Sequence, residues 1–109
     1  MVYWITGRRH SGKTTLAKRM AARVQKAVVL DGDEFREEFP EDFTAEGRQR
    51  NQERLASVAR ILERQGFVPI IACVSPKRGV RSRLQATFAE CIEIQLPFGD
   101  LWPNTTYEE

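Results

Sequence analysis

The sequence is poor in the features that mark secreted, membrane-spanning or metal-binding proteins. It has two cysteines, Cys73 and Cys91, which lie in apolar surroundings without the close spacing of metal-binding pairs. We interpret both as buried thiols in a reducing cytoplasm. No apolar run approaches the roughly 20 residues that cross a bilayer, and Met1 leads into an apolar run without the basic start of a signal peptide. We therefore expect a cytoplasmic location and no membrane partner.

A strong excess of one charge is also lacking. The net charge is +2, which is too small to indicate a nucleic-acid partner. The 109 residues are 41% hydrophobic and 29% charged, so we expect one globular domain over residues 1–109. The basic residues are 13 arginines and 4 lysines. Arginine suits bidentate contacts with phosphate and sulfate oxygens, but most of these arginines fall on predicted helix faces, where solvated surface is the simpler interpretation.

Hydrophobic periodicity predicts strands and helices in alternation. The expected strands cover residues 2–6, 27–30, 67–74 and 91–96, and the expected helices cover residues 14–24, 34–39, 45–65 and 81–89. Thr44 has the position of an N-cap, and residues 97–109 have the composition of a loop or tail. This order predicts an α/β fold, a three-layer α/β/α sandwich with a small, mostly parallel four-stranded sheet.

Residues 7–14 match the pattern GxxxxGK[ST] between the first strand and the first helix, which is typical of a P-loop NTPase-like fold. Glycines let the backbone fold around phosphate, and the following helix directs its positive end at the anion. The side chain of Lys13 can reach the β- and γ-phosphates, and the hydroxyl of Thr14 can ligate Mg²⁺. The pattern predicts binding of ATP with magnesium by Gly7, Arg8, Arg9, His10, Ser11, Gly12, Lys13, Thr14 and Thr15.

Two acidic residues follow the second predicted strand, at the edge of the sheet where the loop also lies. Asp31 and Asp33 could serve phosphoryl transfer, one by deprotonating an attacking hydroxyl and the other by holding hydrated Mg²⁺. They could equally cap the helix that follows. His10, within the loop, has a simpler interpretation than catalysis, because its backbone N–H alone can contact phosphate.

Three further groups could hold an anionic second substrate. Arg36 lies one helical turn after Asp33, and Arg48 and Asn51 share a helix face. Residues 75–78, Ser-Pro-Lys-Arg, follow the third strand at the same edge of the sheet. Each alone is more often solvated surface, and their common placement favours a binding site.

Taken together, these residues resemble the adenylylsulfate kinases. The resemblance covers roughly residues 2–84 and rests on four segments in the family's order: residues 7–14, residues 30–33 with Arg36, residues 43–44 with Arg48 and Asn51, and residues 74–78. Members of that family transfer the γ-phosphate of ATP to the 3′-hydroxyl of adenosine 5′-phosphosulfate, a step of sulfate assimilation. The resemblance therefore implies a small nucleotide as the second substrate.

The resemblance also implies roles for individual residues. Asp33 would activate the hydroxyl with Asp31 beside it, and Lys13, Thr14 and Asp31 would serve ATP and Mg²⁺. The family's acceptor would be held by its phosphosulfate and nucleoside through Arg36, Arg48 and Asn51, with its adenine stacked on Phe43 and its site lined by Ser75 and Pro76.

The sequence departs from the family at several places. His10 and Gly47 stand where the family usually has a glycine and an acidic residue, and the stretch from Arg36 to Phe43 is shorter. The family continues after the fourth strand into a basic lid over ATP, whereas no residue from Leu84 onward is Lys or Arg. Residues 106–109 resemble the family's segment beyond that lid. We therefore expect nucleotide binding to be better retained than transfer.

Two alternatives stay open at this point. One is a P-loop kinase for another small hydroxyl substrate, and the other is a nucleotide-binding module without a lid and without transfer activity. A homodimer is a further arrangement that a bare edge of a short sheet would permit.

Overall fold

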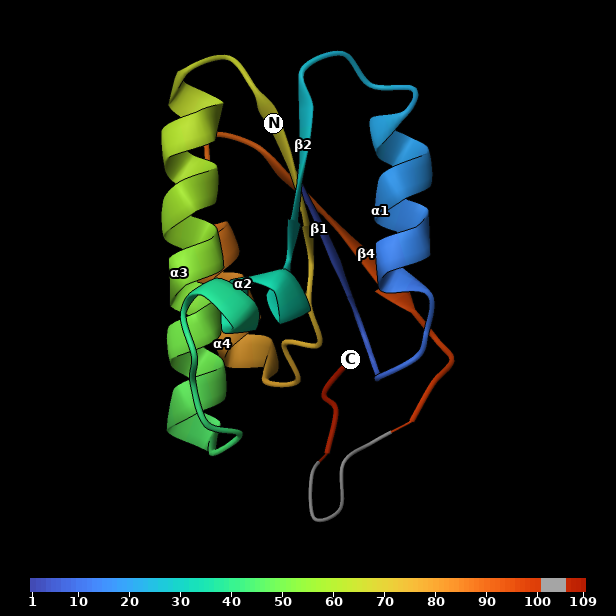
Figure 1. Cartoon of the computed structure of the whole chain (residues 1–109), viewed down its shortest axis with the longest axis vertical. Helices are drawn as coiled ribbons and strands as arrows, with labels where there is room; N and C mark the ends of the chain where they lie inside the picture. Colours follow the sequence, from blue (N-terminus) through green and yellow to red (C-terminus); the bar gives the residue numbers. More distant parts are fainter. Residues whose placement is uncertain (101–105) are drawn as a thin grey trace.

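The computed structural model describes residues 1–100 and 106–109, and its strands form one parallel sheet (Figure 1). The strands are β1 (Val2–Gly7), β2 (Ala27–Asp31), β3 (Val68–Ala72) and β4 (Cys91–Leu96). They lie in the order β2-β3-β1-β4, and the pairings of β1 with β3, β1 with β4 and β2 with β3 are all parallel. The predicted fold class is confirmed, and the sheet is wholly parallel in the described part of the chain.

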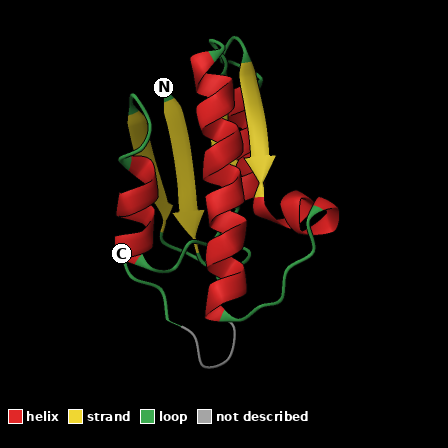
Figure 2. Ribbon diagram, turned by 90° about the vertical axis from the view of Figure 1, so that its left-hand side faces the viewer, coloured by secondary structure: helices red, strands yellow, loops and turns green. Residues whose placement is uncertain are grey.

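Helices cover both faces of the sheet. Helix α1 (Lys13–Ala21) packs on one face, and α3 (Ala45–Arg64) and α4 (Arg78–Gln85) pack on the other. Figure 2 shows α3 running in front of the sheet, and the short α2 (Gly32–Glu38) continues directly from β2. None of these helices has the length and apolarity that a membrane span requires, as far as the described residues go.

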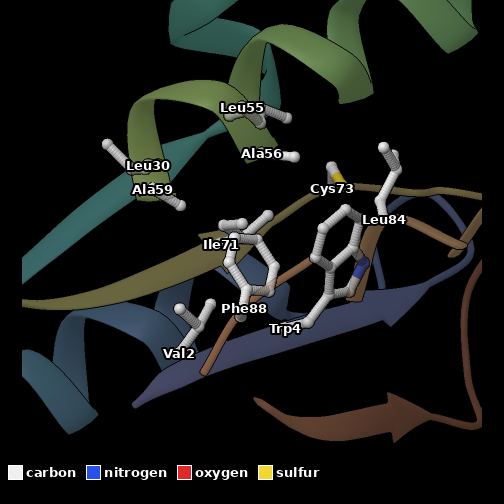
Figure 3. Packing of buried hydrophobic residues seen from close by; sticks show 10 residues of the cluster. All are labelled: Val2, Trp4, Leu30, Leu55, Ala56, Ala59, Ile71, Cys73, Leu84 and Phe88. Atoms are coloured by element: carbon white, nitrogen blue, oxygen red, sulfur yellow. The ribbon is translucent and has the colours of Figure 1, made fainter. Parts of the chain in front are cut away.

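The core is divided between the two faces because successive side chains of a strand point to opposite sides. Trp4 of β1 and Ile71 of β3 point to the side of the sheet that α3 covers, and they belong to one hydrophobic cluster with its buried Leu55 (Figure 3). The neighbouring residues Ile5 and Ile70 belong to the second cluster, beneath α1. Burial on both faces explains why these strands read as continuous apolar runs.

Several element boundaries differ from the predicted ones. The strand expected to reach residue 74 ends at Ala72, because the chain turns at Ser75, where φ is 38°. The helix expected from residue 81 begins at Arg78 after an extended Lys77, and the helix expected to reach residue 24 ends at Ala21. The early end of β3 moves residues 73 and 74 out of regular structure, so residues 73–77 together form the connection between β3 and α4.

The two thiols differ in burial. Cys73 is buried as expected, whereas Cys91 is only partly buried because it lies on the edge strand β4. Desolvation raises the pKa of each thiol to about 11. Both sulfurs are therefore protonated near neutral pH and are poor nucleophiles.

The parallel arrangement brings the carboxyl ends of all four strands to one edge, and three of them lead into the candidate site. Strand β1 ends at Gly7, β2 at Asp31 and β3 at Ala72, and each is followed by a loop or helix start that carries polar residues. In an open α/β sheet this carboxyl edge is where ligands bind. The fold therefore gathers residues from three separate stretches of sequence at one place.

Replacing Leu55 by alanine tests the α3 side of the core. Leu55 is fully buried, so we expect Leu55→Ala to lower the free energy of unfolding by about 2–5 kcal/mol. On the same helix Ile61 is 50% exposed, and Ile61→Ala should cost less than about 1 kcal/mol. Urea unfolding measures both, and equal losses would contradict the packing described here.

Candidate functional site

The loop between β1 and α1 has the backbone of a phosphate cradle. Gly7 and Gly12 have φ values of 156° and 93°, and His10 also has a positive φ of 60°. A Cβ atom on Gly7 would lie 2.9 Å from the carbonyl oxygen of Leu96, so the close approach of β4 requires glycine there. No side chain caps the start of α1. Its first N–H groups and the helix dipole thus face the loop, as anion binding requires.

The side chain of Lys13 lies over this loop. Its ammonium donates hydrogen bonds to the carbonyl oxygen of Arg8 at 2.7 Å and to Oγ of Ser11 at 3.4 Å. Burial lowers the pKa of Lys13, and the nearby carboxylates of Asp33 and Asp31 counteract part of this effect. Lys13 is therefore a partly desolvated cation whose partners here are the loop's own oxygens, where it can instead meet phosphate oxygens.

The two oxygens of the Asp31 carboxylate accept hydrogen bonds from different elements. Its Oδ2 accepts a hydrogen bond from the hydroxyl of Thr14 at 2.5 Å, across from the start of α1. Its Oδ1 accepts from the backbone N–H groups of Asp33 at 2.8 Å and Glu34 at 3.4 Å, at the start of α2. The sequence left capping and site chemistry as alternatives for Asp31, and the geometry supports both, one on each oxygen.

A single cavity of about 370 Å³ joins the loop to the other predicted site residues. Apart from Gly7 and Arg8, every predicted site residue lines it. These are Arg9, His10, Ser11, Gly12, Lys13, Thr14, Thr15, Asp31, Asp33, Arg36, Phe43, Arg48, Asn51, Ser75 and Pro76. Among these residues Asp33 is exposed, whereas Asn51 and Ser75 are buried.

Five of the lining residues were not predicted from the sequence: Gly32, Gln52, Ala72, Cys73 and Val74. The last three could have been found, because they end the most apolar of the predicted strands, directly before Ser75. Gln52 also gave a signal, since it interrupts the apolar stripe of α3 that continues through Leu55 and Ala59.

Two arginines hold the loop that leads into α3. Arg36 donates to the carbonyl oxygen of Asp42 at 3.1 Å, and its guanidinium carbon lies 4.3 Å from the ring centre of Phe43. Arg48 donates to the carbonyl oxygen of Phe43 at 2.6 Å. Burial lowers the pKa of Arg36, although an arginine keeps its charge at any physiological pH. Phe43 is thus placed at the cavity by two cations, with 57% of its surface exposed.

Asn51 and Ser75 contribute in different ways. The amide nitrogen of Asn51 donates to the carbonyl oxygen of Gly32 at 3.2 Å, which fixes the amide against the start of α2. The hydroxyl of Ser75 is directed into the protein, where it accepts from Nε1 of Trp4 at 3.0 Å and donates to Oγ1 of Thr6 at 3.2 Å. Ser75 therefore lines the cavity while its hydroxyl anchors the turn from inside the protein.

Two stretches beyond β4 also reach this edge. Asp100 pairs with Arg9 through two backbone hydrogen bonds of 2.9 and 2.7 Å, and its carboxylate lies 3.2 Å from Nδ1 of His10. The other stretch is residues 106–109. In it, the hydroxyl of Tyr107 lies 2.8 Å from the hydroxyl of Thr6, and the carbonyl oxygen of Glu108 accepts a hydrogen bond from the buried Arg81. The described parts of the predicted tail have irregular backbone and are fixed against the site.

Gly47 of α3 lies in close contact with the loop that precedes this helix. A Cβ atom on Gly47 would lie 2.4 Å from the carbonyl oxygen of Asp42. Asp42 in turn accepts from the backbone and the hydroxyl of Thr44, the N-cap of α3. A side chain at position 47 would therefore require this loop, with its Phe43, to move.

The Gly47 contact predicts an unusual effect of alanine within a helix. Gly47→Ala should lower the free energy of unfolding by about 1–3 kcal/mol, because overpacking outweighs the gain in helix propensity. Gly79 is the matched control: no atom lies within 4 Å of its Cβ position in α4, so Gly79→Ala should stabilise by up to about 1 kcal/mol. Urea unfolding would contradict the contact if both variants were stabilised.

Comparison with known proteins agrees with this geometry. The family described as adenylylsulphate kinase matches residues 1–108. A probable adenylyl-sulfate kinase of Aeropyrum pernix is 37% identical over 115 residues, covering 100% of this chain and 61% of that protein. The adenylyl-sulfate kinase of Burkholderia ambifaria is 40% identical over 94 residues, covering 81% of this chain and 52% of that protein.

A solved structure extends the likeness to a ligand-bound protein. The APS kinase of Mycobacterium tuberculosis in complex with AMPPNP and APS is 26% identical, with a TM-score of 0.74 over 87% of this chain and 61% of that one. The chain thus spans about half to three-fifths of the length of these relatives. Because the family match includes nearly every residue of the sequence, this chain belongs to the adenylylsulphate kinase family.

Proposed function

We propose that this protein transfers the γ-phosphoryl group of ATP to the 3′-hydroxyl of adenosine 5′-phosphosulfate. The observation that carries the proposal is the single cavity, which joins a phosphate-binding loop to an exposed carboxylate, Asp33, and two arginines, Arg36 and Arg48. Family membership supports the same activity, which the names of the relatives assign to those proteins. A cytoplasmic location and a homodimer stay predictions.

The donor half of the cavity fits MgATP. Thr14 and Asp31 present two oxygens to one point, 2.5 Å apart, and Mg²⁺ in kinases typically takes one or two protein oxygens together with phosphate and water. Among the described residues, no group of three or more His, Cys, Asp or Glu side chains could hold a metal without such other ligands. When bound, Mg²⁺ would offset the charge of the β- and γ-phosphates, and Lys13 would contact the same oxygens.

The acceptor half fits a nucleotide that carries a strongly anionic end. Arg36 and Arg48 would bind the phosphosulfate, since guanidinium groups match such oxygens in a bidentate manner. The half-exposed ring of Phe43 would stack on the adenine. Asn51 would orient the nucleoside from the floor of the cavity, where its amide is already fixed by Gly32.

Asp33 would act as the base. Its carboxylate would take the proton of the 3′-hydroxyl as the hydroxyl oxygen bonds to the γ-phosphorus. The bond between that phosphorus and the β–γ bridging oxygen would break, and ADP would leave with the electron pair. Lys13, beside the transferring group, would stabilise the charge on the phosphoryl oxygens.

One observation favours a second candidate, a nucleotide-binding module without transfer activity. The residue that reaches the loop from beyond β4 is an acid, Asp100, whose carboxylate lies 3.2 Å from His10. No Lys or Arg follows Leu84 in the sequence, so the lysine-rich and arginine-rich cover of the family's ATP site has no counterpart in that stretch. A module of this kind would bind ATP without turning over an acceptor.

A turnover assay tests the proposed activity. Purified protein with MgATP and adenosine 5′-phosphosulfate should form equal amounts of ADP and the 3′-phosphorylated product. Lys13→Met should lower the rate by about 100-fold or more, whereas Lys18→Met, at an exposed position of α1, should leave it unchanged. ADP formation without the phosphorylated product, or no product at high protein concentration, would refute transfer and favour the binding module.

Two substitutions at Asp31 separate its two roles. Asn is as good an N-cap as Asp, so Asp31→Asn should keep the free energy of unfolding within about 0.5 kcal/mol, and Asp31→Ala should lower it by about 1 kcal/mol. Both variants lose the charge beside Thr14, so both should need more Mg²⁺ for half-maximal turnover. A Mg²⁺ titration of Asp31→Asn that matches the wild type would limit Asp31 to capping.

A further inference from the structure

Gln52 is a polar residue in an apolar position. It lies on the face of α3 that packs against the sheet, one turn before Leu55 and Ala56, and only 5% of its surface is exposed. Its side-chain oxygen is fully buried and has no hydrogen-bond partner among the described residues. The fold therefore holds this carbonyl oxygen away from water without a compensating hydrogen bond, a cost that an apolar side chain of similar size would avoid.

Gln52 lies beside the proposed acceptor site. Gln52 lines the cavity that also contains Arg36, Arg48 and Asp33, which is the half assigned above to the acceptor. Its neighbour Asn51 has the same property: the amide oxygen is buried without a partner, while the amide nitrogen is bonded to Gly32. Two consecutive residues that line the cavity thus each carry a buried carbonyl oxygen without a hydrogen-bond partner among the described residues.

Buried acceptors of this kind point to a donor that arrives with the ligand. Native proteins rarely leave such groups unpaired, and the exceptions concentrate at functional sites. A carbonyl oxygen accepts hydrogen bonds, so the matching ligand group carries an O–H or N–H and is not an anion. The arginines of the same cavity match an anionic end of the ligand, and the two amide oxygens match a neutral donor group of the ligand.

We infer that Gln52 determines acceptor specificity by accepting a hydrogen bond from a neutral donor of the bound nucleoside, either a ribose hydroxyl or the amino group of the base. This inference rests on the proposed function, because it assumes that a nucleotide fills the acceptor half. It adds a residue of α3 to the site and predicts that the free protein is less stable with Gln52 than with an apolar residue at that position.

The test compares Gln52→Leu with the matched control Gln49→Leu, which makes the same change at an exposed position of α3. Urea unfolding of the free protein should show a higher midpoint for Gln52→Leu than for the wild type, because an unpaired buried oxygen has been removed. In calorimetry with MgADP present, the Kd for adenosine 5′-phosphosulfate should rise about five- to tenfold. The Kd for MgADP alone should not change, and Gln49→Leu should alter neither affinity.

Acceptor analogues distinguish the two donors. With the wild type, the 2′-deoxy analogue should lose the same five- to tenfold in affinity if the ribose is read, and the inosine analogue should do so if the amino group is read. Gln52→Leu should bind that analogue and adenosine 5′-phosphosulfate equally. An analogue that loses as much affinity with Gln52→Leu as with the wild type would overturn the assignment.

The outcomes separate this inference from the proposed function. If the wild type binds no adenosine 5′-phosphosulfate with MgADP present, the proposed function fails and the inference fails with it. If the wild type binds and Gln52→Leu binds equally well, Gln52 has no role in recognition and the proposed function stands. If Gln52→Leu fails to fold, the Kd for adenosine 5′-phosphosulfate is measured with Gln52→Met, whose flexible side chain has a similar length. A variant less stable than the wild type would show that Gln52 serves the fold.

Discussion

The hydrogen bond between Thr14 and Asp31 links the two halves of the site. It joins the first turn of α1 to the end of β2, and the second oxygen of the same carboxylate starts α2. A carboxylate held in this way cannot drift, because both of its oxygens are engaged by groups on separate elements. The position of α2, and with it Asp33 and Arg36, therefore depends on the phosphate-binding loop.

The acceptor side depends on a second constraint, the contact between Asp42 and Gly47. The short loop before α3 leaves no space for a side chain at position 47, and the same loop carries Phe43 between Arg36 and Arg48. The glycine at position 47 and the course of this loop therefore depend on each other.

Much of the fold and the loop could be predicted because their signals are local. The spacing of Gly7 and Gly12 predicts the phosphate-binding loop, and hydrophobic periodicity predicts the alternation of strands and helices. Parallel strands then bring Asp31 and Ser75 to one edge of the sheet. Contacts between distant residues could not be predicted in this way. The sequence does not reveal that the hydroxyl of Ser75 turns inward to Trp4 or that both oxygens of Asp31 are used. Such details depend on how elements far apart in sequence pack.

We propose that one cavity places an ATP phosphate and a nucleotide hydroxyl on either side of Asp33 and Lys13. The sharpest test is a crystal structure of the protein with MgADP and adenosine 5′-phosphosulfate. In it the ADP phosphates should lie within residues 7–14, the phosphosulfate at Arg36 and Arg48, and the 3′-hydroxyl within hydrogen-bonding distance of Asp33. An acceptor bound outside this cavity, or a 3′-hydroxyl directed away from Asp33, would contradict it.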